Sequence, residues 1–336
     1  MALRLIKVVL PERHRKDLGA CLEQLEVMEI WQETIESERL HFEVLVRTEQ
    51  SEAVLDFLEK RFSHIEGFRI ILLPVEASIP RLKPDEEPKP KEKEADEKKQ
   101  AVSKIIRISR EELYSDIEKT VKLSWVYPVM IVFSAVVASI GILRNNVVFI
   151  IGAMVIAPML GPNLALSFAT TLADIFLMRK AVRAIAAGVA AALIPSFLIG
   201  IAFFVDTGIP ELIFRTEVSL GDVILALAAG SAAAISFTSE LFSALIGVMV
   251  AVALLPPLVT MGMLAGSGNR ELALGSLLLF LVNLICVNLA GVVTFLVQGI
   301  RPLTWWEAKK AKKASRKAIL IWTVLLAGLI GILIFS

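Results

Sequence analysis

Residues 151–162 read IGAMVIAPMLGP, and residues 246–257 read IGVMVAVALLPP. Aligned without gaps, six of the twelve positions are identical. Both copies lie in long apolar stretches and contain prolines where a membrane helix is expected to continue. Paired, proline-interrupted apolar segments in corresponding halves of a chain indicate the binding site of a transporter. The sequence therefore predicts where a site lies without naming its substrate.

Charge is segregated along the chain. Of its 336 residues, 56% are apolar, which is more than soluble proteins use. Residues 125–300 contain only 13 Asp, Glu, Lys or Arg, whereas residues 81–100 alone contain 14. One part of the chain is therefore expected in water and a larger part in lipid. The two cysteines, Cys21 and Cys286, fall in different regions, which excludes a disulfide framework or a zinc site.

Residues 1–77 are predicted to form a small cytoplasmic domain, because the apolar run at their start is too short for a signal peptide. A helical period covers 12–26, and Ser51 is expected to cap a second helix. Alternating apolar residues predict four strands, at 3–10, 28–36, 39–47 and 68–75. The order βαββαβ is that of an α+β, ferredoxin-like (ACT-like) fold, which small regulatory domains often use.

A charged linker and a helix lead to the membrane. Residues 78–102 are rich in proline and in charges of both signs, so they cannot bury enough apolar surface to fold. Residues 103–124 resume a helical period. Ser109 and Glu112 have the spacing of a capping box. We expect an amphipathic juxtamembrane helix here.

The region 125–336 is predicted to be an α-helical polytopic membrane domain. Basic residues concentrate in the segments 174–184 and 298–318, which the positive-inside rule places in the cytoplasm. The amino terminus is then inside and the carboxyl terminus outside. Each expected span is close to the roughly 20 residues that cross the hydrocarbon. The seven spans are 125–142, 147–172, 185–205, 221–236, 241–265, 272–297 and 319–335.

The matched segments are the second and fifth spans, one three-span unit apart. An odd number of spans per unit turns the second copy over relative to the first. The sequence thus predicts an inverted 3+3 repeat with a seventh helix added. Proline removes a backbone donor, so both copies are expected to be broken helices. The breaking residues are Pro158, Gly161 and Pro162 in the first copy, with Pro256 and Pro257 in the second.

Polar residues near these breaks are candidates for a substrate or ion pathway. Polar groups at membrane depth face protein or water, and they often mark a route. The alternative is hydrogen bonding between helices, worth about 0.6 kcal/mol on average. The candidates are Asn163, Thr260, Asn283 and Asn288, with Ser167, Thr170 and Thr171 nearby.

Two further groups of charges have competing interpretations. Glu240, at the start of the fifth span, is either a coupling-ion or proton site or a carboxylate that favours the helix dipole. Asp174 has the same structural explanation. The run Arg13, His14, Arg15 and Lys16 opens the first helix and could hold a phosphate or nucleotide as a regulatory ligand, or could be a solvated surface.

Catalytic chemistry is not expected. The three histidines lie in the first domain without metal-ligand partners at useful spacing, and there is no P-loop. No cofactor, metal or nucleic-acid partner is therefore predicted. The basic cluster at 309–317 is explained by topology and anionic lipid headgroups.

The segments GAMVIAPMLGP (152–162) and SREELYSDI (109–117) resemble the prokaryotic membrane family named domain of unknown function 389. The resemblance covers about residues 103–300, and the preceding domain is similar to that of longer members. It implies a multi-pass protein of a bacterial or archaeal inner membrane, assembled as a homo-oligomer, and it brings no substrate.

We therefore expect a transporter or channel-like protein for a small solute or ion, with a cytoplasmic ligand-sensing domain. The alternative is an oligomeric receptor or scaffold that does not transport and has a dry membrane core. An intramembrane enzyme is disfavoured, because the sequence offers no paired acids or nucleophile–base set.

Overall fold

The computed structural model describes residues 3–11, 14, 18, 27–35, 39–75, 108–239, 254–300, 320–324, 327–328 and 331. These residues divide into two compact units, Met1–Leu113 and Tyr114–Ser336.

The first unit contains a four-stranded antiparallel sheet in the order β2-β3-β1-β4. The strands lie within one residue of their predicted positions at each end. They are β1 (Leu3–Pro11), β2 (Glu29–Ile35), β3 (Arg39–Arg47) and β4 (Arg69–Val75). The predicted helix at 12–26 lies outside the described residues except for His14 and Leu18.

The core of this unit lies on one face of the sheet. Ile6, Val8 and Leu10 alternate along β1 and are fully buried, as the two-residue period of a strand requires. Helix α2 (Thr48–Phe62) packs in the same cluster through Leu58. The predicted cap is wrong, because Ser51 lies inside α2 and its hydroxyl donates to the Thr48 carbonyl at 2.7 Å.

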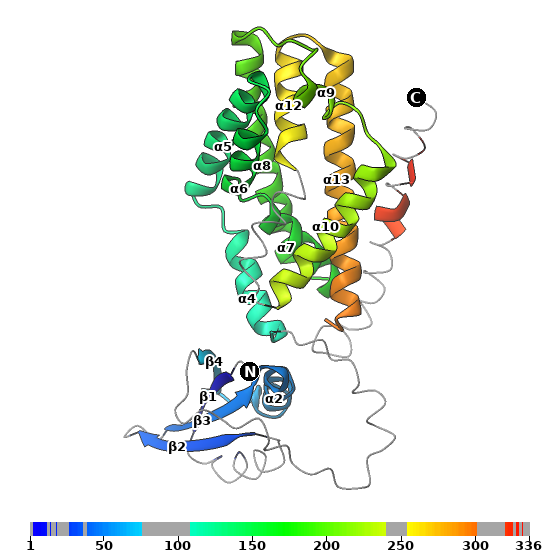
Figure 1. Ribbon diagram of the computed structural model, residues 1–336. Coiled ribbons are helices and arrows are strands. Elements are labelled where there is room, and N and C mark those ends of the chain that lie inside the picture. The colour runs from blue at the N-terminus through cyan, green and yellow to red at the C-terminus, as the bar shows by residue number, and fades with distance from the viewer. Residues whose placement is uncertain are drawn as a thin grey trace. The chain divides into compact units, whose positions relative to one another are not determined.

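The second unit is helical (Figure 1). Helix α4 (Arg110–Thr120) begins in the first unit, and its residues from Tyr114 onward belong to the second. The remaining helices are α5 (Val126–Leu143), α6 (Val147–Ile156), α7 (Leu160–Leu172), α8 (Ile175–Ala202), α9 (Pro210–Ile213), α10 (Leu220–Thr238), α12 (Leu255–Gly266) and α13 (Arg270–Val297).

Four of these helices, α5, α8, α10 and α13, are long and apolar enough to cross a membrane. The pair α6–α7, bent by 51°, makes a fifth. The protein is thus a membrane protein, and of the seven predicted spans these five fall on described helices. Residues 241–253 of the fifth predicted span, and most of 319–335, lie outside the described residues.

Helix α8 begins ten residues before the predicted third span. Asp174 caps it by accepting hydrogen bonds from the amides of Phe176 and Leu177 at 2.9 and 3.0 Å. Arg179 and Lys180 therefore lie in the first turns of a helix, not in a loop.

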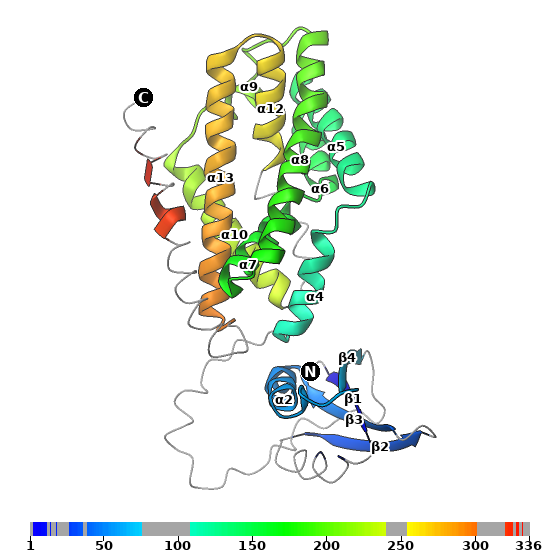
Figure 2. The same ribbon diagram turned by 180° about the vertical axis from the view of Figure 1, so that it is seen from behind.

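The two longest helices, α8 and α13, flank two half-length helices (Figures 1 and 2). Helix α7 lies toward the end of the bundle that contains α4 and Asp174. Helix α12 lies toward the opposite end, which contains α9. There the Glu211 amide donates to Asn145 Oδ1 at 3.3 Å. We call these the α4 end and the α9 end.

The helix bounds repeat at the 95-residue offset that separates Ile151 from Ile246. Leu160 and Leu255, identical in the sequence alignment, are the first residues of α7 and α12. Helices α8 and α13 have 28 residues each and begin 95 residues apart. Helices α5 and α10 match to within one residue.

Small residues allow close approach of α8 and α12. Gly262 and Gly266 form a GxxxG pair on α12 and face Ser196 and Gly200 on α8. A Cβ at Gly262 would lie 2.7 Å from Ser196 Cβ, and one at Gly200 would collide with the Met263 carbonyl. Such pairs let membrane helices pack at short distance.

Candidate functional site

The first broken helix is present. Helix α6 ends at Ile156 and α7 begins at Leu160, with Ala157 extended (ψ 114°) and Pro158 between the helices. Pro162 is in the first turn of α7, where an amide donor is not needed, so it starts the second half of the span rather than kinking it.

In the second copy Pro256 and Pro257 occupy the same position, the first turn of α12. The preceding half of that span lies outside the described residues. Both copies therefore place prolines in the first turn of a half-length helix.

A cavity of about 300 Å³ opens beside the second copy. Its residues come from α6, α9, α10, α12 and α13, together with the segment after α9. Most of its lining is apolar, as is typical of small-molecule sites. The lining residues are Val147, Met154, Glu211, Phe214, Arg215, Asp222, Leu225, Ala226, Pro256, Pro257, Leu279 and Asn283.

Three charged residues belong to this lining. The Arg215 guanidinium donates to the Glu211 carboxylate at 2.7 Å, and both side chains are largely buried. Asp222 forms a capping box with Ser219, which donates to Asp222 Oδ2 from its amide and its hydroxyl, both at 2.8 Å. The lining thus carries one positive and two negative groups.

The cavity extends to the middle of the membrane domain. Asn283 is at the centre of the 28-residue helix α13, about 20 Å from either end. Pro256, at the start of the half-length helix α12, lies at the cavity too. Thr260, one turn further along α12, is fully buried, and its hydroxyl has no hydrogen-bond partner in the described structure. Three predicted pathway residues, Pro256, Pro257 and Asn283, therefore share one cavity.

The other two asparagines meet elsewhere. Asn288 Nδ2 donates to Asn163 Oδ1 at 3.1 Å, and the Ser167 hydroxyl lies 3.2 Å from Asn288 Oδ1. Asn163 Nδ2 also donates to the Met159 carbonyl at 2.8 Å. This buried cluster joins α7 to α13, and it is not part of the cavity lining. Hydrogen bonding between helices explains it, and a pathway role for Asn163 and Asn288 stays a prediction.

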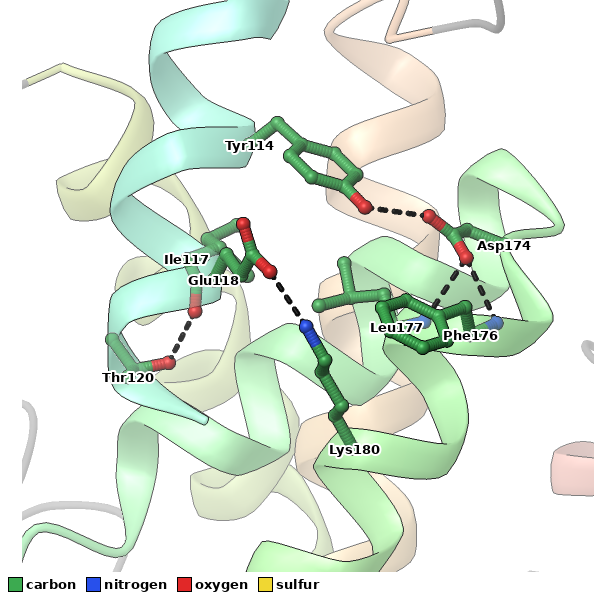
Figure 3. Close-up of polar contacts among 8 residues, drawn as sticks. All are labelled: Tyr114, Ile117, Glu118, Thr120, Asp174, Phe176, Leu177 and Lys180. Atoms are coloured by element: carbon green, nitrogen blue, oxygen red, sulfur yellow. Dashed lines mark hydrogen bonds and ion pairs between the residues drawn. The ribbon is translucent and has the colours of Figure 1, made fainter. Parts of the chain in front are cut away.

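Helix α4 is fixed to the membrane domain at two polar contacts (Figure 3). The Tyr114 hydroxyl donates to Asp174 Oδ2 at 2.8 Å, so this carboxylate serves α4 and caps α8 together. Burial, then the bond to Asp174, raise the pKa of Tyr114 to about 12. The Tyr114 ring also stacks edge-on against Phe168 of α7, with 6.2 Å between ring centroids.

The second contact joins Lys180 Nζ to Glu118 Oε1 at 2.6 Å. This bond lowers the pKa of Glu118. Ile117, between the two contacts, is fully buried, and Thr120 packs on Gly161, where a Cβ would lie 2.7 Å from Thr120 Cβ. The end of α4 thus lies against the first broken helix.

Several predicted residues lie outside the described structure. They are Glu240 and, in the basic run, Arg13, Arg15 and Lys16; only His14 of that run is described. Among the described residues, no group of three His, Cys, Asp or Glu is placed to hold a metal ion.

The sequence interpretation missed the charged residues of the cavity lining and the α4 contacts. Glu211 and Arg215 are spaced i, i+4, and Ser219 with Asp222 has the spacing of a cap, so each local pair can be recognised in the sequence. That they line one cavity is a tertiary fact without a local signal. The same holds for Tyr114 and Asp174, which are 60 residues apart.

The geometry defines a polytopic α-helical membrane protein with a helix break between α6 and α7 and a mostly apolar cavity that contains four polar residues. The family model described as "Domain of unknown function (DUF389)" matches residues 154–289, which include every cavity-lining residue except Val147. An uncharacterized protein of Methanocaldococcus jannaschii is 33% identical over 293 residues, covering 87% of each chain. The chain belongs to the DUF389 family. No solved structure matches it significantly.

Proposed function

We propose that this protein is a non-enzymatic membrane transporter or channel-like protein for a small solute or ion. The observation that carries the proposal is the cavity whose lining includes Glu211 and Arg215 at the α9 end and Asn283 at mid-depth. The unpaired backbone amides of a helix start need protein or water as partners at membrane depth, and the start of α12 borders this cavity.

The inverted repeat is supported by contacts as well as by helix bounds. Ser167 of α7 packs on Gly291 of α13, with a Cβ at Gly291 lying 2.7 Å from the Ser167 hydroxyl. Moving each residue by 95 positions into the other half gives Gly262 and Ser196, which also pack together: a Cβ at Gly262 would lie 2.7 Å from Ser196 Cβ. A pseudo-two-fold axis relating the halves accounts for both pairs, and transporters with inverted repeats place their sites at such an interface.

The charge of the cavity favours cations over anions. Its guanidinium, Arg215, is already paired with Glu211, so Asp222 leaves a net charge of −1. In a cleft with apolar walls this charge concentrates small cations. A small organic cation suits the lining best, because apolar side chains could contact its body while Asp222 attracts its charge.

The orientation follows the positive-inside rule. Arg179, Lys180 and Arg183 lie near the α4 end, whereas Arg144, Arg215 and Arg270 are distributed over three segments at the α9 end. We propose that the α4 end faces the cytoplasm of a prokaryotic inner membrane and the α9 end faces outward. Homo-oligomerisation is part of the same proposal.

For the first unit we propose a ferredoxin-like sensing domain for a small molecule or nucleotide. Its strand order, β2-β3-β1-β4 with every pair antiparallel, is that of the split βαβ arrangement. Within this unit, the buried Arg4 contacts Glu112 at 3.1 Å and Arg110 contacts Asp56 at 3.0 Å. These ion pairs hold the first turn of α4.

Flux measurements on the purified full chain in liposomes test the transport proposal. Choline, potassium, glutamate and phosphate serve as tracers. We expect saturable uptake of at least one cation, and loss of that uptake in Met154→Trp, which places an indole in the cavity. Val155→Trp, the exposed neighbour on the same helix, is the matched control and should transport normally.

Uptake equal to that of protein-free liposomes for all four tracers, with folded protein, would support the receptor or scaffold alternative. Equal flux through both tryptophan variants would also contradict the transport proposal, because an indole that fills the transport route must reduce the flux.

A further inference from the structure

The cavity has a counterpart at the α4 end. This inference rests on the proposed inverted repeat. Shifting the lining residues of α9, the segment after it, α10, α12 and α13 by 95 positions gives the described residues that would line the same space in the other half. Asp222 corresponds to Tyr127, Asn283 to Gly188, and Arg215 to Thr120. The counterpart space is therefore bounded by α5, α8 and the end of α4.

Among the described residues, the Tyr127 side chain occupies part of that counterpart space. The Tyr127 hydroxyl donates to the Ala184 carbonyl at 3.1 Å. The same oxygen would lie 2.7 Å from a Cβ at Gly188, and Ile131 Cδ1 would lie 3.1 Å from it. Where the α9 half has the short side chain of Asp222, the α4 half has a phenol ring lying against a glycine.

A second contact closes the same space from the helix α4 side. Thr120 packs on Gly161, and these residues correspond to Arg215 and Pro256 of the open cavity. Arg215 and Pro256 thus both border the cavity in one half, and their counterparts touch in the other. Burial agrees, since Tyr127 is 7% exposed and Ala184 is 1% exposed.

We propose that these residues form the second, occluded half of the solute site, in which Tyr127 is the plug and Thr120 of α4 is the cover. The structure is then the state open at the α9 end and closed at the α4 end. Withdrawal of the Tyr127 ring from Gly188 opens the site toward α4, and it admits the same small cations as the open half. Tyr127 acts by filling the space, and it takes no part in binding the solute.

One-sided cysteine labelling tests this proposal. Ala184, the counterpart of Leu279, is changed to Cys in a full-length chain in which Cys21 and Cys286 are replaced by Ala. A membrane-impermeant trimethylammonium methanethiosulfonate is added to either face of sealed membrane vesicles. A184C should be unreactive with native Tyr127. In Tyr127→Ala its rate from the α4 face should rise about tenfold or more, because removal of the ring leaves room for water.

Matched variants separate the plug from general damage. Tyr127→Phe keeps the ring and should stay closed, and Val126→Ala changes the exposed neighbour and should have no effect. Gly188→Ala is a second route, because its Cβ displaces the Tyr127 hydroxyl. L279C, labelled from the α9 face, reports the open cavity in every background and confirms folding.

Two outcomes distinguish failure of the occluded half-site from failure of the transport proposal. If A184C stays unreactive in Tyr127→Ala and Gly188→Ala while L279C reacts normally, the occluded half-site is overturned and the open cavity stands. If L279C is unreactive from both faces, the conduit itself is wrong.

Discussion

At the residue scale, we propose that a few side chains decide which half of the molecule is open. Asp222 lines the cavity, whereas Tyr127, 95 positions earlier, bonds to the Ala184 carbonyl through its hydroxyl. The prolines were readable from the sequence because they act on the local backbone. Asn283 and Asn288 looked alike in the sequence, yet one lines the cavity and the other bonds to Asn163. Only helix rotation and packing separate them, and neither is encoded within one segment.

Asp222 should set the charge preference of the cavity. Choline should raise the thermal stability of the purified full chain saturably, whereas 3,3-dimethylbutanol and 3,3-dimethylbutyrate, of the same shape, should not. In Asp222→Asn the affinity for choline should fall about tenfold. The trimethylammonium group has no hydrogen-bond donor, so the loss is one of Coulomb attraction, and tenfold corresponds to about 1.4 kcal/mol. Differential scanning fluorimetry measures this.

Two controls accompany that comparison. Ser219→Ala removes the capping hydroxyl but keeps the carboxylate, so its choline response should persist. Glu217→Gln makes the same chemical change at an exposed position outside the lining. A stronger response to the carboxylate analogue than to choline would reverse the charge assignment.

At the element scale, half-length helices depend on close packing against full-length ones. Gly262 and Gly266 were visible in the sequence as a GxxxG pair, as were Ser196 and Gly200 at the same spacing, but only the structure shows that they face each other. Helix positions were predicted well because apolar length decides them. The start of α8 was missed because its first turns carry Arg179 and Lys180, which read as a loop.

Gly200→Ala should destabilise the contact of α8 with α12 by about 1–3 kcal/mol, because the new methyl group meets the Met263 carbonyl. Gly152→Ala is the matched control, since nothing lies within 4 Å of its Cβ. Unfolding in mixed detergent micelles gives both values. Equal stability of the two variants would contradict the close packing.

The ion pair of Glu118 with Lys180 should hold α4 in place. Ile117 is buried, so its variant Ile117→Cys reports whether α4 stays in place. Glu118→Lys should raise the maleimide reactivity of Ile117→Cys. The double exchange of Glu118→Lys with Lys180→Glu should restore protection. Both partners are partly exposed, so each effect should be at most about 1 kcal/mol. Reactivity unchanged by either single substitution would show that apolar packing alone holds α4.

The pH dependence of this contact has a defined sign. The hydrogen bond from Lys180 lowers the pKa of Glu118 below its ordinary value of 4.5. The contribution of the pair is therefore fully present above that value and is lost as the pH falls through the lowered pKa. The thiolate is the form that reacts, so the rate at Ile117→Cys is divided by the rate of an exposed reference cysteine at the same pH. This ratio should be constant from about pH 6 to 8 and should rise only in more acidic buffer.

At the scale of the whole molecule, the proposed internal duplication places one half-length helix and one 28-residue helix in each half. Two facts follow from that arrangement: the prolines of both copies start half-length helices, and corresponding residues meet in corresponding contacts. The strand positions and the membrane class were predictable because each depends on local pattern. The inverted repeat stays a prediction, which the matching helix bounds support. The cavity depends on the differences between the halves, which a search for similarity does not reveal.

The most direct test of the central claim is the accessibility of Asn283→Cys in the background without native cysteines. An impermeant cationic methanethiosulfonate added at the α9 face should modify it rapidly, and Met154→Trp should suppress the reaction. Val293→Cys, on the exposed lipid-facing side of the same helix, should stay unmodified. No reaction at Asn283→Cys from either face of a folded protein would contradict a water-filled cavity reaching mid-membrane.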